Sequence, residues 1–146
     1  MLQLVLSKVI KLSCLTLVLT FTHNLSAADN IGGVSEQSGK PGSITRTTGE
    51  ELTAQVDTGI QSFDNVETEN GRLKIKFIDD TQISLTEHTF VEITEYVFDP
   101  DPSKSKMAMN FVAGTARFAT GGLGLVPKEN IQIETPTATI GIRGTD

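Results

Sequence analysis

Few side chains in this sequence could serve as a nucleophile or a general base. The 146 residues hold one cysteine, Cys14, and two histidines, His23 and His88. Cys14 and His23 lie within residues 1–28, which have the features of a removable leader. After its removal, a Ser-His-Asp relay would have only His88 as its base, and a zinc-thiolate site would have no cysteine. We therefore expect no enzymatic activity, no catalytic residue and no cofactor.

One group of acidic residues has the spacing of a calcium site. Asp99, Asp101 and Ser103 follow the D-x-D-x-S pattern that opens an EF-hand loop. Lys104 stands where that loop needs a glycine for its sharp turn, and Asn110 stands where it needs a bidentate glutamate. We therefore expect no metal site and interpret this segment as a loop between strands.

The chain is acidic, with 18 Asp and Glu against 12 Lys and Arg and a pI of about 4.9. Lys8 and Lys11 belong to the leader, so the remaining chain has 10 basic against 18 acidic residues, a net charge of −8. Such a surface lacks the broad positive field that nucleic acid or an anionic bilayer requires. We therefore expect no nucleic-acid partner.

Residues 1–28 have the three parts of a secretory signal peptide. Lys8 and Lys11 supply the positive region, residues 12–22 the apolar region, and residues 26–28 the small side chains of a cleavage site. A membrane span needs roughly 20 apolar residues, and this run is shorter. We expect cleavage near Ala28, a periplasmic or secreted location and no stable membrane span; a retained anchor is the alternative.

The rest of the chain predicts an all-β fold. Residues 29–42 are polar and rich in Gly, so we expect a lead-in with at most one short strand, followed by a β domain over residues 43–146. Apolar residues then alternate with period two, and no window has the i, i+3, i+4, i+7 pattern of a helix. We expect short twisted strands in two layers, as a compact sandwich or a solenoid-like roll. The expected strands are residues 72–78, 82–85, 90–98, 106–112, 115–119, 131–134 and 137–142.

The clearest strand is residues 72–78, where Leu73, Ile75 and Phe77 alternate with basic residues. A three-residue loop over residues 79–81 would pair Phe77 with Ile83 and keep one face apolar, whereas a two-residue loop would not. A β-arch, in which these two strands would lie in different sheets, would place the same residues on the apolar face and is the alternative to the hairpin. The side chains expected in the core are Leu73, Ile75, Phe77, Ile83, Leu85, Val91 and Ile93, and those expected at the surface are Lys74, Lys76 and Gln82.

The last two expected strands differ in the parity of their apolar residues. The apolar residues of the first strand have odd residue numbers, Ile131 and Ile133, whereas those of the second have even numbers, Ala138, Ile140 and Ile142. To keep both sets on one face, a bulge or corner is expected at residues 135–136. Because apolar residues still alternate with polar ones close to residue 146, we expect the domain to be C-terminally incomplete.

Three basic side chains share the polar face of the clearest strand. Arg72, Lys74 and Lys76 form a stripe that is distinctive in an acidic chain, and we take them as a candidate protein contact. A solvated face or a charge-protected edge is the ordinary interpretation of such a stripe.

The C-terminal string from Ile131, IQIETPTATIGIRGTD, resembles the closing motif of the FecR-type periplasmic domain. Upstream segments agree in order: residues 59–68 resemble its segment ending in D-x-x-x-T, residues 77–85 its F-x-D-G-[ST]-x-x-x-L strand pair, and residues 114–117 its G-x-x-R strand. The resemblance covers roughly residues 39–146. Asp80 departs from it, because the family commonly has glycine there, which takes positive φ most easily.

The resemblance implies a signal-sensing or protein-interaction module of the cell envelope, with another envelope protein such as an outer-membrane transducer as partner. The family's membrane-spanning regulators have a cytoplasmic region that controls a sigma factor, and here a leader directly precedes the domain. The resemblance therefore does not by itself imply sigma-factor control. The alternative function is a structural or surface-attached β module that binds glycan or spaces other domains.

Overall fold

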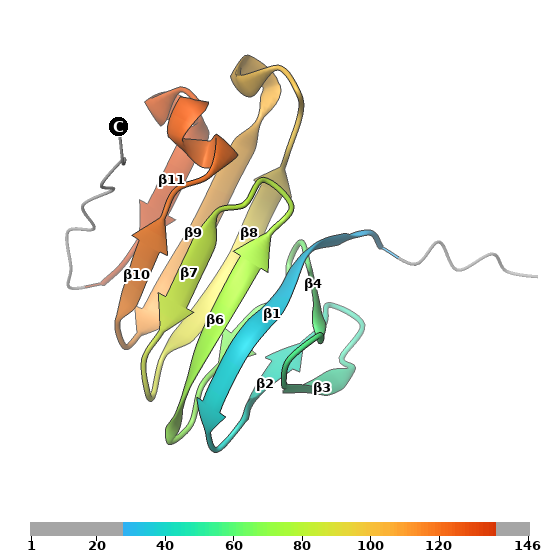
Figure 1. Ribbon diagram of the computed structural model, residues 1–146, viewed down its shortest axis with the longest axis vertical. Helices are drawn as coiled ribbons and strands as arrows, with labels where there is room; N and C mark the ends of the chain where they lie inside the picture. Colours follow the sequence, from blue (N-terminus) through green and yellow to red (C-terminus); the bar gives the residue numbers. More distant parts are fainter. Residues whose placement is uncertain (1–27, 137–146) are drawn as a thin grey trace, which may run out of the picture.

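The computed structural model describes residues 28–136, which form a two-layered β-sandwich (Figure 1). This confirms the all-β expectation. The strands are β1 (Asn30–Gly39), β2 (Gly42–Thr45), β3 (Glu51–Ala54), β4 (Gly59–Gln61), β5 (Asn65–Glu67), β6 (Gly71–Phe77), β7 (Gln82–Leu85), β8 (Phe90–Val97), β9 (Lys106–Ala113), β10 (Ala116–Ala119) and β11 (Ile131–Glu134). Short 3₁₀ turns, η2 (Pro102–Lys104), η3 (Gly122–Leu125) and η4 (Lys128–Asn130), occupy the loops between the later strands.

Each layer is one sheet. The first sheet has the strand order β10-β7-β6-β1-β4, and the second has the order β11-β9-β8-β5-β2-β3. Neighbouring described strands are antiparallel, except that β11 runs parallel to β9. Because successive side chains point to opposite faces of a strand, each sheet presents one apolar face to the core and one polar face to solvent.

The expected core is confirmed. Leu73, Ile75, Phe77, Ile83, Leu85, Val91 and Ile93 are all buried, and the ring of Phe77 stacks on that of Tyr96 with centroids 4.5 Å apart. Of the expected surface residues, Lys76 is exposed, whereas Lys74 and Gln82 are half-buried by their neighbours on the polar face.

The connection from β6 to β7 is a hairpin, but its expected register is wrong by two positions. Ile75 lies opposite Ile83, and the Phe77 amide donates to the Thr81 carbonyl at 2.8 Å, so the loop is residues 78–80. The cause is Asp79, whose buried carboxylate accepts hydrogen bonds from both the amide (3.0 Å) and the hydroxyl (2.7 Å) of Thr81. Asp80 then takes a φ of 65°, which is the left-handed conformation that glycine provides more easily at this turn.

The lead-in contains a longer strand than expected. β1 is ten residues long and lies between β6 and β4 inside the first sheet. Its glycines hide the alternation, since only Ile31 and Val34 are large and apolar, and its register shifts between Val34 and Glu36. Gly32 is required by a close approach, because a Cβ there would lie 2.6 Å from the carbonyl oxygen of Lys76.

The sandwich has an open end at β10 and β11, the last strands of their sheets. Their inward side chains are only partly buried: Ala116, Phe118, Ile131 and Ile133. β11 ends at Glu134, just before the expected corner at residues 135–136. The expected strand over residues 137–142 and the leader through residue 27 lie outside the described residues. Among residues 28–136 no helix is long and apolar enough to cross a membrane.

Candidate functional site

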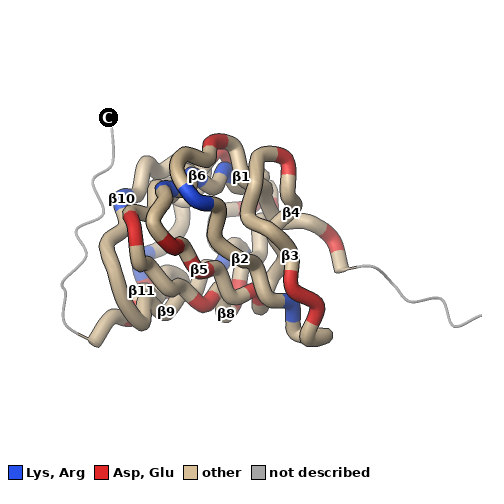
Figure 2. Tube along the Cα trace, turned by 90° about the horizontal axis from the view of Figure 1, so that it is seen from below, with Lys and Arg blue, Asp and Glu red and all other residues tan. Residues whose placement is uncertain are grey.

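The outer face of the first sheet carries the basic residues singled out from the sequence. Arg72, Lys74 and Lys76 alternate with buried residues along β6. Strand pairing adds a fourth cation, because Lys74 lies opposite Ser84 on β7, and Ser84 lies opposite Arg117 on β10. We call these four cations the basic face. Figure 2 shows blue segments beside β6 and β10.

Arg117 is not among the contact residues predicted from the sequence. Its outward direction follows from the alternation with Ala116 and Phe118, but its position on the same face as Lys74, with Ser84 between them, depends on β10 pairing with β7. β10 is separated from β7 in the sequence by two strands of the other sheet. Only the tertiary fold brings the four cations together.

Three of the four cations lie near carboxylates. Lys74 Nζ is 2.6 Å from Glu36 Oε1, Lys76 Nζ is 2.8 Å from Asp80 Oδ1, and Arg72 Nε is 3.9 Å from Glu87 Oε1. Such exposed pairs contribute about 0–1 kcal/mol each, so a partner's carboxylates could replace them at little cost. Arg117 forms no ion pair with any described residue.

A trough of about 1080 Å³ runs along this face. Its lining includes Arg72, Lys74 and Arg117, together with the hydroxyl side chains of Ser84 and Thr86. Toward the open end of the sandwich, it reaches the aromatic side chains of Phe111 and Phe118, which meet edge to face at 5.8 Å. The trough therefore combines cations and hydroxyl groups with an apolar end.

The outer face of the second sheet has the opposite charge. One cross-strand row, in order from β11 to β3, is Glu134, Asn110, Glu92, Asn65, Thr45 and Glu51. Its three glutamates make no ion pair with any described residue. In Figure 2, red segments lie beside β5 and β3. The sandwich is thus polarised, with a basic layer and an acidic layer.

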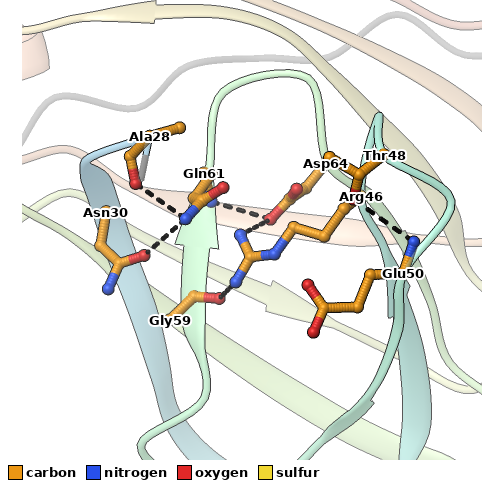
Figure 3. A network of polar contacts seen from close by, with 8 residues as sticks. All are labelled: Ala28, Asn30, Arg46, Thr48, Glu50, Gly59, Gln61 and Asp64. Carbon is orange, nitrogen blue, oxygen red and sulfur yellow. Dashed lines mark hydrogen bonds and ion pairs between the residues drawn. The ribbon is translucent and has the colours of Figure 1, made fainter. Parts of the chain in front are cut away.

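A buried ion pair links the turn after β2 to the loop between β4 and β5 (Figure 3). Arg46 Nη1 donates to Asp64 Oδ2 at 2.8 Å, and Arg46 Nη2 donates to the Gly59 carbonyl at 3.2 Å. The Gln61 amide also donates to Asp64 Oδ2, at 2.8 Å. Burial raises the pKa of Asp64, against the opposing effects of the Gln61 hydrogen bond and the Arg46 charge. Because both side chains are engaged within the protein, we assign this network to fixing the loops around β4.

Asp79 organises a second buried network. Its carboxylate accepts from Thr81, from the Tyr96 hydroxyl and from the Leu123 amide, the last at 2.8 Å. The Gly122 amide donates to the Asp79 carbonyl at 2.7 Å. Burial, followed by the hydrogen bond and negative charge of Asp79, raises the pKa of Tyr96. The network ties three segments together: the turn after β6, the end of β8, and η3.

The remaining candidate residues have local structural roles. The Asp99 carboxylate accepts from the Asp101 amide at 2.8 Å, and the Asp101 carboxylate accepts from the amide (3.0 Å) and hydroxyl (2.7 Å) of Ser103. These side chains cap their own turn. His88 is exposed in the turn before β8, with a φ of 55°.

Comparison with known proteins gives one finding. No curated protein and no solved structure matches the chain. A model of the FecR protein family matches residues 64–146, which are more than half of the chain. The matched span contains β6, β7, the Asp79 turn and the four cations of the basic face, and it leaves out residues 39–63 of the expected resemblance. The chain therefore belongs to the FecR family.

Proposed function

We propose that this protein is an exported, non-enzymatic sensing module of the cell envelope that binds another envelope protein. Family membership supports the coarse role of a signal-sensing envelope domain. Residues 1–28, with their signal-peptide pattern, support export to the periplasm. The proposal of binding without turnover rests on the sequence, in which His88 is the one histidine, and no cysteine remains, after the leader.

The basic face is the proposed contact surface, and its charge is the observation that carries this proposal. Arg72, Lys74, Lys76 and Arg117 project from one layer of a chain whose net charge after the leader is −8. A complementary partner surface would be acidic, since electrostatic complementarity sets partner choice and association rate. The existing ion pairs are exposed and weak, so exchanging them for a partner's carboxylates loses little stability.

Charge reversal of the basic face tests the proposal. A triple variant combines Arg72→Glu, Lys74→Glu and Lys76→Glu. It should lose partner capture in a pull-down from envelope extract, while its melting temperature stays close to the parent's. A matched control reverses three exposed lysines elsewhere, Lys104, Lys106 and Lys128, and produces the same change in net charge. The control should retain capture.

Two results would overturn the proposal. Equal losses in the two triple variants would mean that net charge, not the basic face, governs binding. Retention of the parent on purified cell-wall glycan, with no protein captured, would instead favour a surface module that binds glycan. The hydroxyl groups of Ser84 and Thr86 beside the cations in the trough are the feature that such a ligand would use.

A further inference from the structure

The outer face of the first sheet carries two cations at a fixed spacing. Strand pairing sets Arg117 on β10 opposite Ser84 on β7, and Ser84 opposite Lys74 on β6. We call these three residues the basic row. Neighbouring strands lie about 4.8 Å apart, so the backbone positions of the two cations are about 10 Å apart. A hydroxyl group lies between them.

The outer face of the second sheet carries two carboxylates at the same spacing. Glu134 on β11 lies opposite Asn110 on β9, and Asn110 lies opposite Glu92 on β8. We call these three residues the acidic row. Its glutamates are also two strands, or about 10 Å, apart, with an amide between them. No side chain in either row is buried.

The two rows are complementary when the faces of two copies are laid against each other. Arg117 of one copy would meet Glu134 of the second copy, and Lys74 would meet Glu92. The match continues on the next strand of each sheet, where Glu36 lies opposite Lys74 on one face and Asn65 lies opposite Glu92 on the other. An asparagine amide can donate to a carboxylate, so four successive strands have compatible groups.

The charges of both rows are available for contact. Arg117, Glu92 and Glu134 form no ion pair with any described residue. Lys74 Nζ lies 2.6 Å from Glu36 Oε1, but an ammonium group has three donors. Lys74 can therefore bind a second carboxylate while it keeps the first.

We propose that copies of this protein stack head to tail, with the basic row of one copy against the acidic row of the next. The rows lie on opposite sides of the sandwich: in Figure 2, β6 and β10 are in the upper layer, and β8, β9 and β11 are in the lower one. Each copy therefore keeps one row free after the first contact. A contact between two different surfaces need not close on itself, so the stack grows beyond a dimer.

This inference goes beyond the proposed function, because the occupant of the basic face is here a second copy. A neighbouring copy and a bound envelope protein exclude each other on that face.

The size of the faces indicates weak association. The first sheet has five strands, and β6 has seven residues, so the face measures at most about 24 Å by 23 Å. Contact between two such faces buries about 1100 Å² in total, which is at the small end for specific interfaces. Stacking should therefore appear at protein concentrations of about 0.1–1 mM.

Sedimentation equilibrium of the purified protein tests the stack. At low salt and about 1 mM protein, we expect the weight-average mass to be about twofold or more above the monomer mass and to rise with concentration without a plateau. It should return to the monomer value at 1 M salt, where the Debye length is about 3 Å. A monomer at every concentration, or association that strengthens with salt, would overturn the proposal.

A charge exchange between the rows tests which surfaces meet. One variant combines Lys74→Glu with Arg117→Glu, and the other combines Glu92→Lys with Glu134→Lys. Each variant alone has like charges on both faces and should stay monomeric. An equimolar mixture should regain the mass of the parent, because every contact in an alternating stack joins opposite charges. A mixture that stays monomeric, or association of either variant alone to the parent's level, would refute the pairing of these rows.

Two control variants separate the rows from net charge. Lys104→Glu with Lys128→Glu has the same net charge as the variant of the basic row, and Asp29→Lys with Glu129→Lys has that of the variant of the acidic row. All four side chains are exposed, and both controls should associate like the parent. Equal losses in the controls would mean that net charge governs association. These measurements involve no partner, so their failure leaves the pull-down test of the proposed function unaffected.

Discussion

Replacing Asp79 by asparagine should destabilise the protein far more than the same change at Asp80 beside it. The Asp79 side chain is buried and accepts from the Thr81 amide and hydroxyl, the Tyr96 hydroxyl and the Leu123 amide. Asparagine has one acceptor oxygen in place of two, and its NH₂ group would face donors. The Asp80 side chain is exposed, and its interaction is an ion pair with Lys76.

The magnitude follows from the donors that lose a partner. Leaving one buried donor unsatisfied costs about 1–3 kcal/mol, and asparagine would leave at least one of these donors without an acceptor. We therefore expect Asp79→Asn to lower the free energy of unfolding by about 2–3 kcal/mol, and Asp80→Asn by less than about 0.5 kcal/mol. Asparagine tolerates the left-handed conformation at residue 80, so this control introduces no new strain.

Urea unfolding measures both variants, and equal m-values would show that the comparison concerns stability alone. Similar losses at residues 79 and 80 would refute the assignment of Asp79 as the buried centre of the network. A loss at Asp79→Asn no larger than that of an ordinary surface substitution would show that its donors find other acceptors, such as water.

The other predictions concern the core, the turn, the pH dependence and export. Phe77→Ala should cost about 3–5 kcal/mol in urea unfolding, whereas Lys74→Ala should cost less than about 1 kcal/mol, since it removes only a surface pair; equal costs would contradict the inward facing of Phe77. Asp80→Val should cost about 1–3 kcal/mol more than Asp80→Gly, because a β-branched residue is strained at a φ of 65°; equal stabilities would show that the turn takes another conformation. Because the pKa of Tyr96 is raised in the folded state, its contribution is fully present below pH ~10, the ordinary tyrosine pKa, and should be lost as the pH rises above it; a Tyr96→Phe variant whose stability falls as steeply there would contradict this. Mass spectrometry of protein from the periplasm should give an N-terminus near Asp29, and intact protein in the inner membrane would refute cleavage.

The strands and their facing could be predicted from local alternation, because a strand's side chains alternate whatever it pairs with. This is why the prediction is correct for β6 and β7 and their buried residues, and for the bounds of β11. The same principle fails for β1. Its glycines carry no side-chain pattern, and Gly32 is needed because the neighbouring backbone approaches closely.

The assignment of polar side chains could not be made from the sequence. Asp79 and Asp80 are chemically identical neighbours, yet one is buried under Tyr96 and the other is exposed. That difference depends on η3, a much later segment of the chain, whose Leu123 amide completes the network. The shifted register of the hairpin is a consequence of the same buried carboxylate.

Short stretches of sequence were enough to establish the class of fold, the inward and outward facing of most strands, the family motif and the three cations on β6. They did not establish which strands are neighbours, and so could not place Arg117 on the same face as Lys74, or Arg46 against Asp64. The two kinds of feature differ in how far apart in the sequence the residues that determine them lie. Alternation is a property of a few consecutive residues, whereas strand order and buried ion pairs depend on contacts between distant segments that only the packed core brings together.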